Sequence, residues 1–208
     1  MSRRPDQPVR VSAGFCLLAA WFGAVNGWSL LATVLTAAAI HELGHCAALR
    51  LLGARVTGIR VGVFGAVLET DSRALSYGGE LLAVLAGPGA NLLCALTLTA
   101  LGGVRQAVPA GAHLALCAFN LLPVRPLDGG RALYLLAAWA AGPSAAERAA
   151  RWIGNAAALA LAAGLCYLMW RTGGSLWLLP PAMGLLYTAT AAGKRQMSRS
   201  IFKNKEKD

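Results

Sequence analysis

The sequence contains few charged residues, and acidic residues are the scarcest of them. Only 13% of its 208 residues are charged and nine are Asp or Glu, whereas 57% are hydrophobic. Soluble domains are closer to half apolar and about a quarter charged. The composition therefore excludes an ordinary soluble domain and predicts a membrane protein.

Two long stretches lack almost every ionisable side chain. Between Val11 and Ile40 the only ionisable residue is Cys16, and between Leu81 and Val104 it is Cys94. Apolar runs of about 20 residues or more are typical of helices that cross a bilayer. A very hydrophobic soluble core does not explain runs of this length.

The sequence also lacks the patterns of disulfide-rich and nucleic-acid-binding proteins. Its five cysteines are widely separated, and most lie in apolar runs, so we expect no disulfide framework and no cysteine metal site. The net charge is +10, but the basic residues form short clusters between apolar runs and do not alternate with aromatic residues. We expect these clusters to contact the lipid bilayer, with no nucleic acid as partner.

The hydropathy pattern predicts an all-α polytopic membrane protein with about six transmembrane helices, in a single domain over residues 1–208. The expected spans are 11–26, 28–52, 76–101, 110–124, 153–170 and 175–192. Residues 54–70 alternate in polarity and are rich in Val, Gly and Thr, which predicts a small β-hairpin between the second and third spans, turning near Phe64-Gly65. A loop and an amphipathic segment fill 125–150, and a basic tail covers 194–208.

The basic residues predict the orientation of these spans in the cell membrane. If both termini lie on one side, that side collects seventeen of the nineteen Lys and Arg residues. The other side keeps Arg105 and Arg171. Basic residues accumulate on the cytoplasmic side of membrane proteins, so we expect a multi-pass protein with both termini in the cytoplasm.

One short motif carries chemistry, His41-Glu42-Leu43-Gly44-His45, near the end of the second expected span. Histidines four residues apart stand on the same face of a helix, where both imidazoles can bind one Zn²⁺. Glu42 lies about 100° around the helix from His41, beside the metal. A carboxylate there can take a proton from water and return it to a leaving amine.

Zinc in a catalytic site needs one further protein ligand. The candidates are His113 and Asp128. Asp128 follows the fourth expected span on the same side of the membrane as the end of the metal-binding helix, so we favour it. His113 is expected near the opposite end of its span, too far from the motif, as a packed or interfacial histidine. The prolines and glycines around Asp128 predict non-helical backbone, which membrane proteins tolerate where it lines a polar cavity.

Together these segments resemble the site-2 protease family of intramembrane zinc metalloproteases. The similar segments are the HELGH motif, the later NLLPVRPLDGG segment that begins at Asn120, and AGPGANL at 86–92. The resemblance covers about 28–135, which would be the catalytic core. The six-span layout is most similar to the stage IV sporulation protein FB branch.

The resemblance implies that His41, His45 and Asp128 hold zinc, with Glu42 as the catalytic base. It implies that Asn91 and Asn120 are polar helpers near the cleft. The implied substrates are membrane-associated or single-span proteins, cut by regulated intramembrane proteolysis; in the sporulation branch the substrate is a sigma-factor precursor or regulator. A membrane regulatory protein would be a further partner.

A substrate must present extended backbone, because carbonyls within a helix are already hydrogen-bonded. The predicted hairpin offers a strand edge that could pair with such a segment, although a purely structural hairpin fits the pattern equally well. Two other functions remain open. A zinc or proton-coupled transporter would spread ionisable residues over several spans, whereas here they gather at one end of two. A catalytically silent scaffold would more often have lost Glu42 or Asp128.

Overall fold

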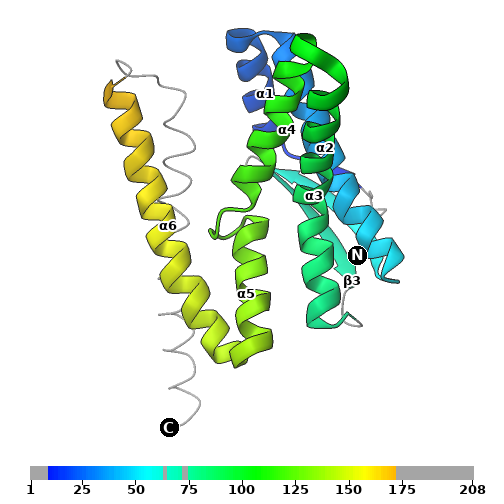
Figure 1. Cartoon of the computed structure of the whole chain (residues 1–208), viewed down its shortest axis with the longest axis vertical. Coiled ribbons are helices and arrows are strands. Elements are labelled where there is room, and N and C mark those ends of the chain that lie inside the picture. Colours follow the sequence, from blue (N-terminus) through cyan, green and yellow to red (C-terminus); the bar gives the residue numbers. More distant parts are fainter. Residues whose placement is uncertain (1–8, 63–64, 72–74, 172–208) are drawn as a thin grey trace, which may run out of the picture. The chain divides into compact units, whose positions relative to one another are not determined.

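The computed structural model describes residues 9–62, 65–71 and 75–171 (Figure 1). The chain divides into two compact units, Met1–Leu121 and Leu122–Asp208. Each unit is considered separately below, and the expected single domain over 1–208 stays a prediction.

The first unit contains a small sheet and a group of packed helices. Its elements in chain order are β1 (Val9–Val11), α1 (Ala13–Asn26), α2 (Trp28–Leu51), β2 (Arg55–Gly62), β3 (Gly65–Asp71), α3 (Tyr77–Gly102), the 3₁₀ helix η1 (Gly103–Gln106) and α4 (Ala107–Asn120). Helices α2, α3 and α4 pack against one another, and α1 packs against α2 (Figure 1).

Local sequence explains where several of these helices begin and end. The hydroxyl of Ser12 accepts a hydrogen bond from the backbone of Phe15, and Ser76 caps α3 in the same way through Gly79. Such caps satisfy amide groups that have no partner inside the helix. Gly27 separates α1 from α2 with a φ of 95°, which is accessible to glycine and strained for other residues.

Small residues allow α2 and α3 to approach closely. A Cβ added at Gly44 would lie 2.6 Å from the carbonyl oxygen of Ala86 and 2.9 Å from the Cβ of Ala90. Most of the buried apolar residues of the described chain are alanines, whereas many leucines and tryptophans are exposed. This distribution is the reverse of a water-soluble core and is typical of helices that pack through small residues in lipid.

The predicted hairpin is present as β2 and β3, which pair antiparallel. Arg55 pairs with Asp71 at one end of the hairpin and Gly62 pairs with Gly65 at the other. The two residues that link the strands, 63–64, lie outside the described residues. The sequence did not predict β1, which pairs in parallel with β2 and gives the sheet order β1-β2-β3. A three-residue strand is too short to show a clear alternation.

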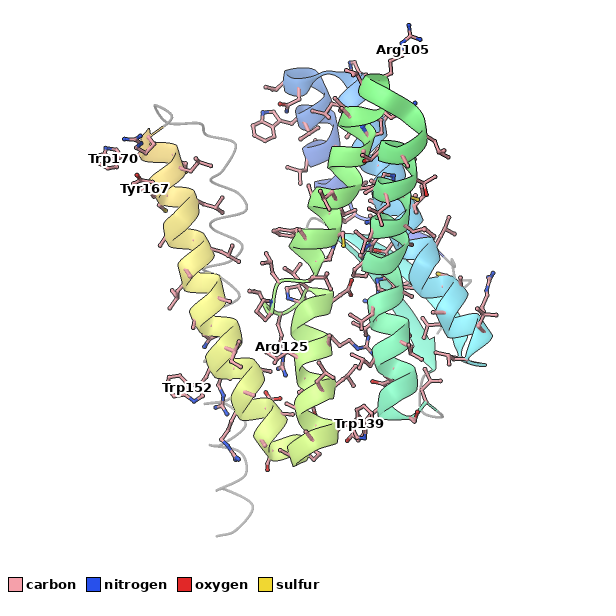
Figure 2. All side chains as sticks on the ribbon, viewed as in Figure 1. Arg105, Arg125, Trp139, Trp152, Tyr167 and Trp170 are labelled. Carbon is pink, nitrogen blue, oxygen red and sulfur yellow. The ribbon has the colours of Figure 1, made fainter. Side chains whose placement is uncertain are left out.

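The second unit contains α5 (Asp128–Ala141) and α6 (Pro143–Arg171), which pack on each other. Part of the face that α6 buries consists of small residues at a spacing of four, namely Ala146, Ala150, Gly154, Ala158 and Ala162. In contrast, Trp152, Tyr167 and Trp170 are exposed along the same helix (Figure 2). Aromatic side chains of this kind are common at membrane interfaces.

Three helical segments of the described chain are long and apolar enough to cross a membrane, Trp28–Leu51, Tyr77–Asn120 and Pro143–Arg171. The second of these includes α3, η1 and α4 together. The predicted helical fold is therefore confirmed as mostly helical, with a small sheet, and these three segments fit the predicted membrane protein. The count of six spans is not confirmed: α1 has only 14 residues, and the expected sixth span, 175–192, and the basic tail, 194–208, lie outside the described residues.

Candidate metal centre

The two histidines of the HELGH motif face each other on α2. Nε2 of His41 lies 3.1 Å from Nε2 of His45, and the rings stand edge-on at 85°. Both side chains are buried. The four-residue spacing therefore places two imidazole nitrogens at one point, as the sequence predicted.

This geometry fits a tetrahedral zinc ion. Two nitrogens bound at about 2.05 Å in tetrahedral directions lie about 3.3 Å apart, close to the observed separation. The other ring nitrogen of His45, Nδ1, lies 2.8 Å from the carbonyl oxygen of Ala83 on α3. Because a carbonyl only accepts hydrogen bonds, Nδ1 carries the proton and Nε2 keeps its lone pair for a metal.

Gly87 on α3 provides the space for the His45 ring. A Cβ at this position would lie 2.6 Å from Cε1 and 2.7 Å from Cδ2 of His45, and closer still to Nε2. Any larger residue would therefore displace the imidazole. The next residue, Pro88, is fully buried. This part of α3 therefore packs closely beside the histidine pair.

His41 is held by a second set of contacts, which reaches α4. Its Nδ1 lies 3.2 Å from Nδ2 of Asn91 on α3, and Oδ1 of Asn91 lies 3.0 Å from Nδ1 of His113. The expectation that His113 lies far from the motif was wrong. Helix α4 begins three residues earlier than predicted and ends at Asn120, so His113 is in the middle of the helix rather than near its end.

The contact between His113 and Asn91 could have been predicted from the sequence, although not from hydropathy alone. A histidine in the middle of an apolar helix is costly unless it has a polar partner. Asn91 is a polar residue in the middle of the neighbouring span that could provide it.

Two further predicted residues, Glu42 and Asn120, also belong to the first unit. Glu42 follows His41 on α2 and is partly buried. The side-chain amide of Asn120 donates to the carbonyl of Leu116 in its own helix, 3.0 Å away. The assignments of Glu42 as base and of Asn91 and Asn120 as cleft helpers stay predictions.

Asp128 belongs to the second unit, where it is the first residue of α5 and partly buried. The first turn of that helix closes on the residue before it, because the carbonyl of Leu127 accepts hydrogen bonds from the amides of Gly130 and Arg131 at 3.1 and 3.2 Å. A Cβ at Gly130 would lie 2.7–2.8 Å from backbone atoms of Val124 and Arg125, so glycine is required for this close approach.

Comparison with known proteins gives both sequence relatives and a fold. No family model matches the chain. It is 32% identical over 120 residues to sll0528 of Synechocystis and 33% identical over 131 residues to Rip3 of Mycobacterium tuberculosis, both named as zinc metalloproteases. These matches cover 53% and 57% of the chain, which spans only about a third of each relative, 31% and 32%.

A solved structure matches almost the whole chain. It is the site-2 protease from Methanocaldococcus jannaschii, with a TM-score of 0.65, 20% sequence identity, and coverage of 92% of this chain and 93% of that one. The fold is that of a site-2 protease. The family resemblance predicted from the motifs is thereby confirmed, whereas the stage IV sporulation protein FB branch stays a prediction.

Proposed function

We propose that the chain is an intramembrane zinc metalloprotease that hydrolyses peptide bonds of membrane-associated or single-span proteins. The observation that carries the proposal is the pair of facing imidazole nitrogens, 3.1 Å apart, on a helix apolar enough to cross a membrane. The names of the sequence relatives and the fold of the solved structure support the same chemistry.

The proposed zinc ligands are His41, His45 and Asp128. Three protein ligands leave one position open for water or substrate, as catalytic zinc sites require. Asp128 is the candidate because it begins a helix directly after a loop that contains Pro123 and Pro126, and carboxylates are good zinc ligands. Bound at these residues, zinc would polarise the scissile carbonyl and lower the pKa of a bound water.

Glu42 is the proposed general base. It follows His41 directly on α2, so its carboxylate projects beside the ligand pair rather than on its face. Glu42 would take a proton from the attacking water and later return it to the leaving amine, which splits a peptide bond without a covalent intermediate.

The sheet of the first unit is the proposed docking site for the substrate backbone. In the order β1-β2-β3, strand β3 is at the edge of the described sheet. A substrate in extended conformation could add to such an edge through main-chain hydrogen bonds, which do not depend on its sequence. This would align the substrate as a strand before cleavage.

The function is tested with the full chain reconstituted in liposomes with single-span and amphipathic-tail proteins as substrates. We expect one zinc per chain by elemental analysis and zinc-dependent cleavage that chelation abolishes. Zinc or proton flux across the liposome without cleavage would identify a transporter. If the protein is stable but binds no zinc and cleaves no substrate under metal-replete conditions, it is a catalytically silent scaffold.

We also propose that the protein crosses the cell membrane several times with both termini in the cytoplasm. The support is the split of seventeen basic residues against two between the two sides of the expected topology. Cysteines introduced at each end of a cysteine-free variant should be labelled only after the membrane is permeabilised. Labelling of either end in intact cells would contradict this orientation.

A further inference from the structure

Three buried polar side chains connect the metal-ligand pair to α4. His41 on α2, Asn91 on α3 and His113 on α4 are 5%, 0% and 4% exposed. The contacts are His41 Nδ1 to Asn91 Nδ2 at 3.2 Å and Asn91 Oδ1 to His113 Nδ1 at 3.0 Å. In so apolar a bundle each contact must pair a donor with an acceptor, because an unmatched buried polar group is costly.

With the Asn91 amide oriented as it is in the structure, this chain of hydrogen bonds runs in one direction. The amide nitrogen of Asn91 faces His41 and donates to its Nδ1, so the proton of neutral His41 is on Nε2 and points to His45. His45 accepts there, because its own Nδ1 donates to Ala83. At the other end His113 donates from Nδ1 to the amide oxygen. Each of these four contacts pairs a donor with an acceptor.

A metal bound to Nε2 of His41 requires the opposite direction. Coordination uses the lone pair of Nε2, so the proton of the neutral ring must be on Nδ1, which becomes a donor. The amide atom facing it must then be the oxygen of Asn91. The amide nitrogen turns to His113, whose Nδ1 must now accept. A half-turn of the amide produces this arrangement, because its oxygen and nitrogen ends have nearly the same size.

We propose that His113 is a positioning residue for the metal ligand His41, acting through the side-chain amide of Asn91. Metal binding turns the amide over and transfers the proton of His113 from Nδ1 to Nε2. Both imidazoles stay neutral throughout, so no proton is gained or lost overall. This inference rests on the proposed zinc site but concerns a residue that does not bind the metal.

The chemistry of position 113 explains why a histidine is suited to it. The partner of Asn91 must donate in one state and accept in the other. Imidazole does so by changing tautomer, and glutamine could do so by turning its own amide over. Leucine can do neither, and it would leave one end of the buried Asn91 amide unpaired in both states.

The first test observes the proton directly in the wild-type protein. The chain has only three histidines, so labelling histidine with ¹⁵N gives six ring nitrogens, and a His113→Gln sample assigns the pair from His113. We expect His113 to carry its proton on Nδ1 in metal-free protein and on Nε2 after one equivalent of Zn²⁺. An unchanged tautomer would overturn the proposal.

The second test measures zinc affinity by competition with a chelator. Partners that orient a metal-bound histidine typically contribute about 10–100-fold in affinity. We expect His113→Leu to lose about tenfold and His113→Gln to stay close to wild type. The matched control is Cys117→Ala, a buried residue one turn further along α4, which should not change affinity. Equal losses in the Leu and Gln variants would show a purely packing role and overturn the proposal.

A double variant shows whether His113 acts through Asn91. If it does, adding His113→Leu to Asn91→Leu should cost no further zinc affinity, because the link is already lost. Additive losses would overturn the proposal. Wild-type protein that binds no zinc would refute the proposed function itself, whereas zinc binding and cleavage with an unchanged His113 tautomer would refute only this inference.

Discussion

The histidine pair and Asp128 are positioned by different means. In the first unit His45 is enclosed by Gly87 and bonded to the Ala83 carbonyl, while His41 is bonded to the buried Asn91. In the second unit Asp128 starts a helix, the amide of Leu127 in the preceding loop donates to the carbonyl of Val124 at 2.8 Å, and Val124 is buried against α6.

The polar interactions around the loop are of a different kind from those around the histidines. Arg125 donates to both carboxylate oxygens of Glu147, at 3.2 and 3.0 Å, and its guanidinium lies 5.5 Å from the centre of the Tyr134 ring. Both charged side chains are 50% exposed, so solvent screens them. We therefore expect substitutions near the histidines to affect the metal, and substitutions in this exposed pair to affect it little.

The largest expected effect is that of Asp128→Asn. A neutral amide is a much weaker zinc ligand than a carboxylate, so zinc content should fall well below one per chain and cleavage should be lost. Glu147→Gln removes a carboxylate from the same unit and should keep its zinc. Elemental analysis after dialysis compares the two variants. Full zinc retention in Asp128→Asn would show that another residue is the third ligand.

Glu42→Gln should separate chemistry from metal binding. The substitution keeps the shape of the side chain but removes its ability to accept a proton, and the ligands are untouched. We expect kcat to fall by about 10²–10⁴ while zinc stays near one per chain. The variant should also retain bound substrate, which makes it useful for capturing substrates. Cleavage at the wild-type rate would contradict the role of Glu42.

Gly87→Ala should reduce zinc affinity, because the new Cβ would occupy the space of the His45 ring. We expect a loss of about 10–100-fold, the range typical when a ligand loses its supporting geometry. Gly89→Ala is the matched control: it lies two residues further along α3, and nothing is within 4 Å of its added Cβ. If both variants bind zinc equally well, the close packing of Gly87 against the imidazole does not position His45.

The sequence predicted well those features that depend on local spacing. The i, i+4 histidines, the helical segments that fall within the described residues and the hairpin of β2 and β3 all follow from periodicity, and the structure contains them. The resemblance of three short motifs to site-2 proteases correctly predicted the fold.

Features that depend on packing between distant segments were not predicted. The contact of Asn91 with His113 depends on the registration of α3 against α4, which a three-residue error in the start of α4 was enough to obscure. The need for glycine at positions 87 and 130 arises from neighbours that are distant in sequence or in a non-helical loop. Strand β1 pairs with β2 across more than forty residues, and its three residues have no pattern of their own.

The smallest expected effect is that of Arg125→Gln. An exposed ion pair contributes about 0.2–1 kcal/mol, and a cation–π contact at an exposed site about 0.5–1 kcal/mol. We therefore expect a small decrease in thermal stability, reduced further by salt, with zinc affinity and cleavage close to wild type. The thermal stability of Arg125→Lys should lie between that of wild type and that of Arg125→Gln, because an ammonium keeps the charge but cannot reproduce the two parallel hydrogen bonds of the guanidinium. Arg148→Gln, the same charge change at an exposed site on α6, is the matched control. If Arg125→Gln loses zinc and Arg148→Gln does not, the exposed pair positions Asp128, and the contrast between the two units is wrong.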